Sequence, residues 1–211
     1  MAAVVEPQYH ADVDTRVSLD EYVELERATG ERHEFHDGKV VRMVGGSGPH
    51  SAIGISISAE LYLQLKGTNR VVHGSDLRIA LPTLCTYVYA DCVIPDGVPQ
   101  FVSPKDSLTN PIVIFEVLSP STEAYDRGDK FGQYRTIETF REYLLVCQDR
   151  PHVEQFLKQD DGNWLLKEYN GNNAVITIES LGCQLSLADV YAKVDFTKAE
   201  RTPVPESEKR V

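Results

Sequence analysis

The sequence predicts an α/β (α+β) protein in which helices flank a mixed sheet. Segments with a helical apolar period alternate along the chain with short runs rich in β-branched and aromatic residues. The apolar fraction of 42% and the charged fraction of 25% are ordinary for a globular chain, and 211 residues suffice for a sizeable core. Helices packed on a sheet would bury the apolar surfaces of both.

Three segments have helical signals. Ser18, with Glu21 three residues later, forms a capping-box pattern that opens a helix running to about residue 28. A second helix is expected over about 50–66, because one apolar stripe recurs there every four residues. Its members are Ile53, Ile57, Leu61 and Leu65. A third helix fits residues 127–139.

The strand signals lie between and after these helices. Asp37-Gly38 between two β-rich runs predicts a tight hairpin turn. Further strands are expected over 70–74, 76–81, 86–94, 111–118, 142–147, 152–158, 164–170 and 174–178. No repeat or linker interrupts this order, so we expect one domain over 18–196, with polar tails at 1–17 and 197–211.

Composition excludes several classes of protein. The net charge of −11 argues against broad non-specific binding of nucleic acid, which normally uses a basic surface. The chain has neither a run of roughly 20 apolar residues nor a secretory signal at its start, so we expect no membrane partner and a cytoplasmic location. The four cysteines form no CxxC pair, which favours buried thiols in a reducing compartment over zinc or disulfides.

A glutamate interrupts the most apolar strand. Glu116 lies in IVIFEVL, where both faces are apolar, and directly before a Ser-Pro-Ser-Thr loop. A carboxylate there is costly to desolvate unless it has a partner. Asp91 lies in the preceding strand, TYVYADCVI, and two carboxylates on neighbouring strands can share a divalent cation. Hydrogen bonds from loop amides or pairing with an arginine would also satisfy Glu116, and the spacing leaves both interpretations open.

The third helix places a lysine among apolar residues. One face of it carries Lys130, Phe131, Tyr134 and Ile137. The ammonium of Lys130 is therefore expected to point toward the core and Glu116, where it could position an attacking water or stabilise a scissile phosphate. The alternative is a buried stem with the ammonium in water. Asp126 is expected to cap the start of this helix.

Several of these motifs are similar to those of one protein family. The segments EVLSPSTEAYDRGDKFGQYR, ERHEFHDGKVVRM, PHSAIG and REYLLV resemble a large bacterial family of predicted endonucleases, abundant in cyanobacteria and also found in actinobacteria. The resemblance covers roughly residues 18–192. It implies a restriction-endonuclease-like fold of the PD-(D/E)xK superfamily, with a mixed central sheet flanked by helices.

The resemblance also implies a set of site residues. The metal-binding aspartate of the family falls on Asp91, its strand glutamate on Glu116, and its lysine, displaced onto the following helix, on Lys130. Glu34 and His50 match further positions of the family. From strand alternation alone, Glu34 shares a face with His36, and a solvated or cross-strand pair is the alternative for them.

Two positions depart from the family pattern. Ala90 stands where the family usually has proline, which alters backbone rigidity but removes no ligand. Leu118 occupies the superfamily's ordinary lysine position, two residues after Glu116. Catalysis would therefore depend on Lys130 reaching back toward the strand.

The function implied by the resemblance is hydrolysis of DNA phosphodiester bonds with Mg²⁺ or Mn²⁺. Asp91 and Glu116 would hold the ion, and Lys130 would orient or help deprotonate a bound water. A homodimer is compatible with this function, since many enzymes of the superfamily pair two sites for two strands. Two alternatives remain open: a catalytically lapsed binding or regulatory module, and a phosphodiesterase of small nucleotides, which suits the acidic charge better.

Overall fold

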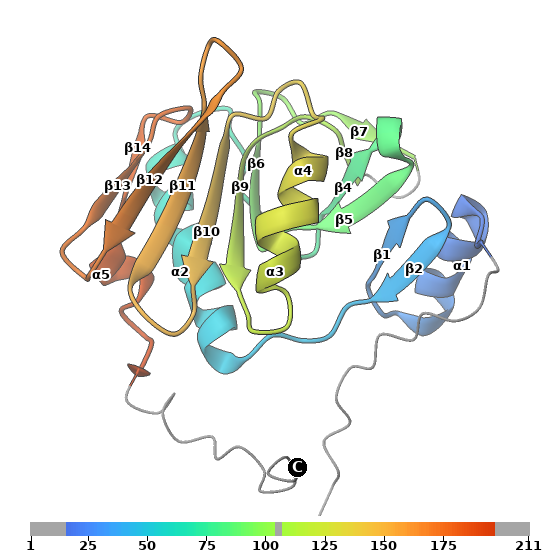
Figure 1. Cartoon of the computed structure of the whole chain (residues 1–211), viewed down its shortest axis with the longest axis horizontal. Coiled ribbons are helices and arrows are strands. Elements are labelled where there is room, and N and C mark those ends of the chain that lie inside the picture. The colour runs from blue at the N-terminus through green and yellow to red at the C-terminus, as the bar shows by residue number, and fades with distance from the viewer. Residues whose placement is uncertain (1–15, 104–106, 197–211) are drawn as a thin grey trace, which may run out of the picture.

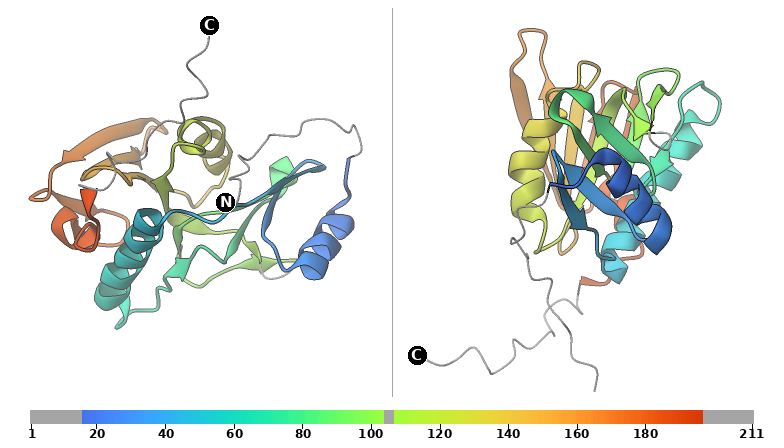
Figure 2. Two further views of the ribbon diagram at one scale, coloured as in Figure 1. Left: turned by 90° about the horizontal axis from the view of Figure 1, so that it is seen from below. Right: turned by 90° about the vertical axis from the view of Figure 1, so that its right-hand side faces the viewer.

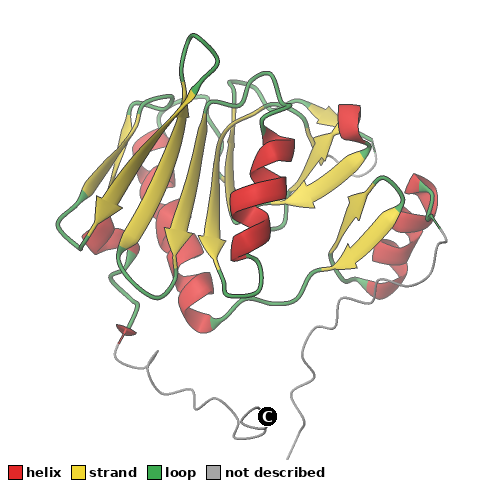
Figure 3. Ribbon diagram, viewed as in Figure 1, coloured by secondary structure: helices red, strands yellow, loops and turns green. Residues whose placement is uncertain are grey.

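The strands in the described part of the chain form two six-stranded sheets and one separate hairpin (Figures 1 and 3). The structure is a computed structural model that describes residues 16–103 and 107–196. The predicted tails therefore lie outside the described residues, except for residues 16 and 17. Val17 donates a backbone hydrogen bond to Gly38, so this part of the predicted N-terminal tail contacts the hairpin turn.

The first sheet has the strand order β2-β1-β5-β4-β8-β7. Its strands are β1 (His33–His36), β2 (Lys39–Arg42), β4 (Arg78–Leu81), β5 (Thr86–Tyr89), β7 (Phe101–Val102) and β8 (Ser107–Leu108). The predicted hairpin turn is confirmed, because β1 pairs with β2 across Asp37 and Gly38, both with positive φ. The capping box is also confirmed at the start of α1 (Leu19–Thr29), which packs Tyr22 against Phe35.

The second sheet has the order β12-β11-β10-β9-β6-β3. Its strands are β3 (His73–Gly74), β6 (Cys92–Pro95), β9 (Pro111–Leu118), β10 (Glu142–Cys147), β11 (His152–Lys158) and β12 (Trp164–Asn170). β9 and β10 are parallel and the other neighbours are antiparallel, so the sheet is mixed. The hairpin comprises β13 (Val175–Ile178) and β14 (Cys183–Ser186).

Helices cover both faces of the second sheet (Figure 2). On one face, the predicted stripe of α2 (Gly48–Leu65) is buried against Phe115 and Val117, together with α5 (Leu187–Val190). Full burial of each such aliphatic side chain contributes about 1.5–3 kcal/mol. The other face is covered by a continuous helical segment made of α3 (Glu123–Tyr125), the π-helical turn η2 (Asp126–Lys130) and α4 (Phe131–Tyr134).

The structure corrects two predicted elements. The expected strand over 86–94 is two strands, β5 in the first sheet and β6 in the second, and Asp91 lies in the bend between them. A local alternation pattern cannot reveal a change of sheet, because residues on both strands are buried. The third helix begins at Glu123 rather than 127, and its regular part ends at Tyr134.

Smaller elements escaped the sequence patterns because they are too short for a period to be detected. They are β7, β8, β14, α5 and the 3₁₀ turn η1 (Pro82–Leu84). Burial of the free cysteines is confirmed for Cys92, Cys147 and Cys183, but the prediction is wrong for Cys85, which is exposed in a left-handed conformation after η1. None of the helices in the described part of the chain is long and apolar enough to cross a bilayer.

Candidate active site

A buried lysine lies between three carboxylates where the two sheets meet. The ammonium Nζ of Lys130 is 3.0 Å from Glu116 Oε1, 3.4 Å from Asp126 Oδ1 and 3.7 Å from Glu34 Oε1. Lys130 is only 5% exposed, so the alternative in which its ammonium reaches water is wrong. We refer to Lys130, Glu116, Asp126 and Glu34 as the Lys130 cluster.

Three different elements supply the members of the Lys130 cluster. Glu116 comes from β9, all eight residues of which are buried. Lys130 and Asp126 are four residues apart on η2, so both side chains face the sheet. Glu34 comes from β1, which belongs to the first sheet, and is the third carboxylate of the cluster.

Tyrosine hydroxyls hold two of the carboxylates in place. Tyr134, on α4, donates a hydrogen bond to Glu116 Oε1 at 3.0 Å. Tyr125, on α3, donates one to Glu34 Oε2 at 3.3 Å. Glu34 Oε1 also accepts the backbone N–H of Tyr89 at 3.3 Å. The orientation of each carboxylate is thus determined by groups from other elements.

Glu34 also contacts the histidine that the strand pattern placed beside it. The distance from His36 Nε2 to Glu34 Oε2 is 3.2 Å. Because Glu34 is 6% exposed, the alternative of a solvated pair is wrong. Glu34 is therefore part of the Lys130 cluster through its contact with Lys130.

Asp91 and His50 form a second, more accessible pair beside the Lys130 cluster. His50, in the first turn of α2, places Nε2 3.3 Å from Asp91 Oδ2, and the two side chains are 19% and 18% exposed. The same oxygen accepts the backbone N–H of Val117 at 2.7 Å. Since Cys92 pairs with Phe115, the antiparallel register brings Asp91 beside Glu116.

The Lys130 cluster contains three carboxylates and one ammonium, and this excess of negative charge affects the pKa values of its members. Burial lowers the pKa of Lys130, but the carboxylates of Glu116, Glu34 and Asp126 outweigh it and hold that pKa well above its usual value. Burial raises the pKa of Glu116 well above its usual range, and it raises the pKa of Asp126 as well. Burial acts in the same direction on Glu34, yet Lys130 and His36 hold its pKa below the usual value. The cluster therefore keeps an ionised lysine and attracts a further positive charge, either protons or a cation.

The pair formed by Asp91 and His50 also favours positive charge. The hydrogen bond to Asp91 raises the pKa of His50, and burial opposes this only in part. An imidazolium at this position would neutralise the carboxylate that the resemblance assigns to metal binding.

Sequence reasoning missed three residues of this site. Asp126 does not cap the helix, because it lies inside the continuous helical segment and pairs with Lys130. Its spacing of four residues from Lys130 was the available signal. Tyr134 was recognised only as part of the apolar stripe, although its hydroxyl binds Glu116. Tyr125 carried no signal, since its contact with Glu34 spans 91 residues of sequence.

The oxygen donors of this site fit a magnesium-like ion. Among the described residues, the hydrogen bonds and ion pairs of Asp91 and Glu116 go to one oxygen of each carboxylate, Oδ2 and Oε1. Mg²⁺ typically binds to one or two carboxylates and completes its shell with waters and substrate phosphates. Asp91 and Glu116, with further carboxylates of the Lys130 cluster nearby, match that requirement. Such an ion does not need a complete shell of protein ligands.

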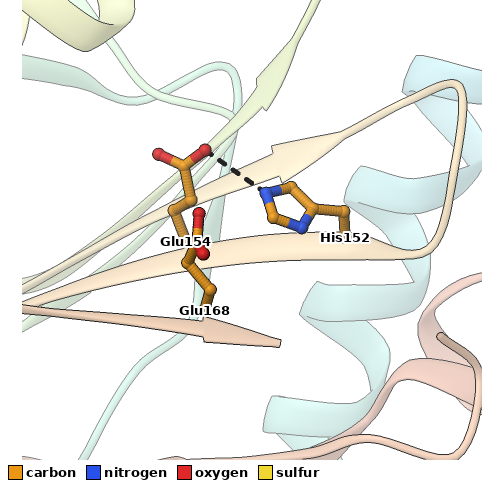
Figure 4. A group of neighbouring side chains, drawn as sticks. All are labelled: His152, Glu154 and Glu168. Carbon is orange, nitrogen blue, oxygen red and sulfur yellow. Dashed lines mark hydrogen bonds and ion pairs between the residues drawn. The ribbon is translucent and has the colours of Figure 1, made fainter. Parts of the chain in front are cut away.

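A group of three metal-ligand side chains also lies within the described part of the chain, but elsewhere. It consists of His152, Glu154 and Glu168 on β11 and β12 (Figure 4). Asp91 and Glu116, the metal ligands that the resemblance implies, do not belong to this group of three.

Comparison with known proteins gives consistent matches. A model of the Uma2 family, described as "Putative restriction endonuclease", matches residues 19–189. The chain is 33% identical over 181 residues to the protein slr1290 of Synechocystis sp., covering 86% of this chain and 94% of that one. It is 35% identical over 157 residues to sll1609 of the same organism, covering 74% and 89%. Both relatives are described as uncharacterized proteins.

A solved structure shares the fold. It is a protein from Anabaena variabilis, described as a "putative nuclease belonging to DUF820", with a TM-score of 0.66 and 17% sequence identity. The match covers 83% of this chain and 98% of the other. The predicted fold class, an α/β (α+β) restriction-endonuclease-like arrangement of mixed sheets flanked by helices, is confirmed.

Proposed function

Because the chain belongs to the Uma2 family, we propose that it is a divalent-metal-dependent endonuclease that hydrolyses phosphodiester bonds in DNA. The observation that supports this most directly is the contact between Lys130 Nζ and Glu116 Oε1 at 3.0 Å. It joins a lysine to a strand glutamate although the two are not on the same element. Lys130, although displaced onto η2, can therefore supply the ammonium that is missing at the superfamily's ordinary lysine position, which Leu118 occupies here.

In this proposal Asp91 and Glu116 hold Mg²⁺ or Mn²⁺. Such an ion, when bound, lowers the pKa of a coordinated water and neutralises charge on the phosphate. Burial raises the pKa of Glu116, and this supports the assignment, because a bound cation would favour the ionised carboxylate that burial disfavours.

The side chains of the protein have separate roles. Lys130 orients the attacking water and stabilises negative charge that develops on the phosphate. Glu34 and Asp126 hold its ammonium in place as positioning residues. Tyr134 fixes Glu116 through its hydroxyl, and His50 fixes Asp91 through Nε2.

The net charge of −11 restricts how DNA could bind. Broad attraction to the phosphate backbone is unfavourable, so contact would be local and assisted by the metal ion. A homodimer that offers two sites to two strands belongs to the same proposal, and light scattering of the purified chain tests it. A mass near 24 kDa, matching the 23.6 kDa monomer, would contradict the dimer.

The direct test is cleavage of supercoiled plasmid and of single-stranded DNA with Mg²⁺, Mn²⁺ or EDTA. Wild-type protein should cleave only with metal, and Glu116→Ala and Lys130→Ala should abolish cleavage. Glu138→Gln is the matched control, since Glu138 is exposed on a turn after α4. Cleavage by Glu116→Ala at the wild-type rate would refute the proposed role of that carboxylate.

The acidic charge favours a second candidate, a phosphodiesterase of small nucleotides. A small substrate does not require a basic surface. Metal-dependent hydrolysis of a model phosphodiester, with plasmid left intact, would support this candidate over the endonuclease. Calorimetry that detects no Mn²⁺ binding, together with no hydrolysis of any of these substrates, would instead indicate a lapsed module in which the Lys130 cluster is a structural ion-pair network.

A further inference from the structure

Three metal-ligand side chains lie on two neighbouring strands outside the Lys130 cluster. His152 and Glu154 are two residues apart on β11, so they share a face of the sheet. Glu168 lies directly opposite Glu154 on β12. One ligand atom of each residue lies within 4.8 Å of the others, and the two glutamates point toward the same space as the imidazole (Figure 4).

The imidazole of His152 is oriented with one nitrogen toward this space. Its Nδ1 is 2.7 Å from Asn170 Oδ1, and an amide oxygen can only accept, so Nδ1 carries a hydrogen. Nε2 then faces Glu154 Oε1 at 3.3 Å. Nε2 and Oε1 are thus the two atoms that face each other, and both are atoms that can bind to a metal ion. A metal ion bound to both atoms would replace this direct contact.

The imidazole of His152 is buried and held in one orientation. His152 is 8% exposed, so water has little access to the ring. Asn170 fixes the tautomer in the way that an outer hydrogen-bond partner commonly fixes a metal-binding histidine.

The carboxylate of Glu154 is held by its other oxygen. Arg127, on η2, contacts Oε2 and leaves Oε1 directed toward His152. This contact with Arg127 is an ion pair, which a carboxylate makes in its ionised form. An ionised carboxylate is the form that binds metal ions.

Glu168 adds a second negative charge at the same place. Like charges directly opposite each other on antiparallel strands are destabilising. Glu168 is exposed, which opens the group to solvent on one side. An ion could enter there and complete its coordination shell with water.

We propose that His152, Glu154 and Glu168 bind one divalent transition-metal ion of the Zn²⁺ class, with Asn170 and Arg127 as positioning residues. Imidazole nitrogen combined with carboxylate oxygen suits such ions, whereas Mg²⁺ and Ca²⁺ prefer oxygen alone. The site is separate from the Lys130 cluster, because β10 lies between β9 and β11. It does not depend on the proposed nuclease activity.

The test is calorimetric titration of Zn²⁺ into the full chain after treatment with a chelator. Wild-type protein should bind Zn²⁺ at this site, and His152→Ala and Glu168→Gln should each weaken that binding at least tenfold. Asn170→Ala should weaken it by about 10–100-fold, the usual effect of losing an outer partner. Because Glu168 is exposed, Glu168→Gln should keep the wild-type circular dichroism spectrum and remains informative even where His152→Ala does not fold.

Two further variants locate the ion. Glu116→Gln and Glu138→Gln should retain the Zn²⁺ site, since neither residue belongs to it. The visible absorption of bound Co²⁺ gives a second readout, which should be lost in Glu168→Gln. Absence of Zn²⁺ binding, or equal affinity of wild type and Glu168→Gln, would overturn the proposal. A loss in Glu168→Gln without a loss in a folded His152→Ala would also overturn it, because only general negative charge would then attract the ion.

Discussion

Two groups of carboxylates on the second sheet differ in what neutralises them. Glu116, Leu145, Glu154 and Glu168 stand in one row across four neighbouring strands. At one end, Glu116 is 4% exposed and receives the ammonium of Lys130. At the other end, Glu154 receives Arg127 on one oxygen only, and Glu168 is exposed. The same residue type therefore meets an ammonium of the chain in one place and is open to solvent a few strands away.

Depth in the structure explains the difference. A buried carboxylate requires a partner that the chain itself supplies, because leaving it unpaired costs several kcal/mol. An exposed carboxylate can remain solvated and accept an external ion. Four experiments test whether depth separates the two groups, and their expected effects decrease in the order Lys130→Ala, Zn²⁺ binding, titration of Glu116 and Arg127→Ala.

Removal of the buried cation should have the largest effect on stability. Lys130→Ala leaves Glu116, Glu34 and Asp126 buried without their shared ammonium, so the free energy of unfolding should fall by about 3–5 kcal/mol. Urea denaturation followed by circular dichroism measures this. Lys39→Ala, at an exposed position of β2, is the control and should change stability little. A loss below about 1 kcal/mol in Lys130→Ala would show that the cluster does not depend on its lysine.

Zn²⁺ should stabilise the protein through the other carboxylate group. At a free concentration 100 times its dissociation constant, a ligand that binds only the folded state adds about 2.7 kcal/mol to the free energy of unfolding. Thermal denaturation with and without Zn²⁺ should show this gain in wild type and in Glu116→Gln. The gain should disappear in Glu168→Gln and on addition of EDTA. An equal gain in Glu168→Gln would assign the ion to another part of the protein.

The raised pKa of Glu116 should appear in the pH dependence of stability. Between the unfolded pKa, near 4.5, and the higher folded pKa, the folded state binds more protons than the unfolded state. The contribution of Glu116 to stability therefore decreases as pH rises through that window, by up to about 1.4 kcal/mol per pH unit. Glu116→Gln lacks this titration.

Urea denaturation of wild type and Glu116→Gln between pH 4 and pH 8 tests the sign. The difference in unfolding free energy, wild type minus variant, should decline as pH rises above about 4.5. A difference that stays constant, or that increases with pH, would mean that burial does not raise the pKa of Glu116.

Loss of Arg127 should have the smallest effect on stability. Its side chain is 31% exposed and pairs with Glu123 and Glu154, so Arg127→Ala should cost at most about 1 kcal/mol. The comparison with Lys130→Ala is direct, because both residues lie on η2 but differ in depth. Similar losses in the two variants would show that depth does not distinguish the two groups.

The sequence predicted much of the fold and pointed to three of the four residues of the Lys130 cluster, Glu34 by the family resemblance alone. The strand over 111–118 and the stripe of α2 were identified from periodicity, because burial on a regular element repeats at a regular spacing. Glu116 and Lys130 were noticed because a charge stood in an apolar pattern. Asp126 and Tyr134 were assigned other roles, since a local pattern shows which face a residue occupies but not which group it meets.

Local sequence specifies the elements that can bury an apolar face and the charges that interrupt those faces. Long-range packing establishes that the chain changes sheets at Asp91 and that Glu34 meets Lys130. It also places Glu154 opposite Glu168. Helix and strand periods depend on near neighbours in the chain, whereas the partner of a buried charge depends on which distant segments pack against it.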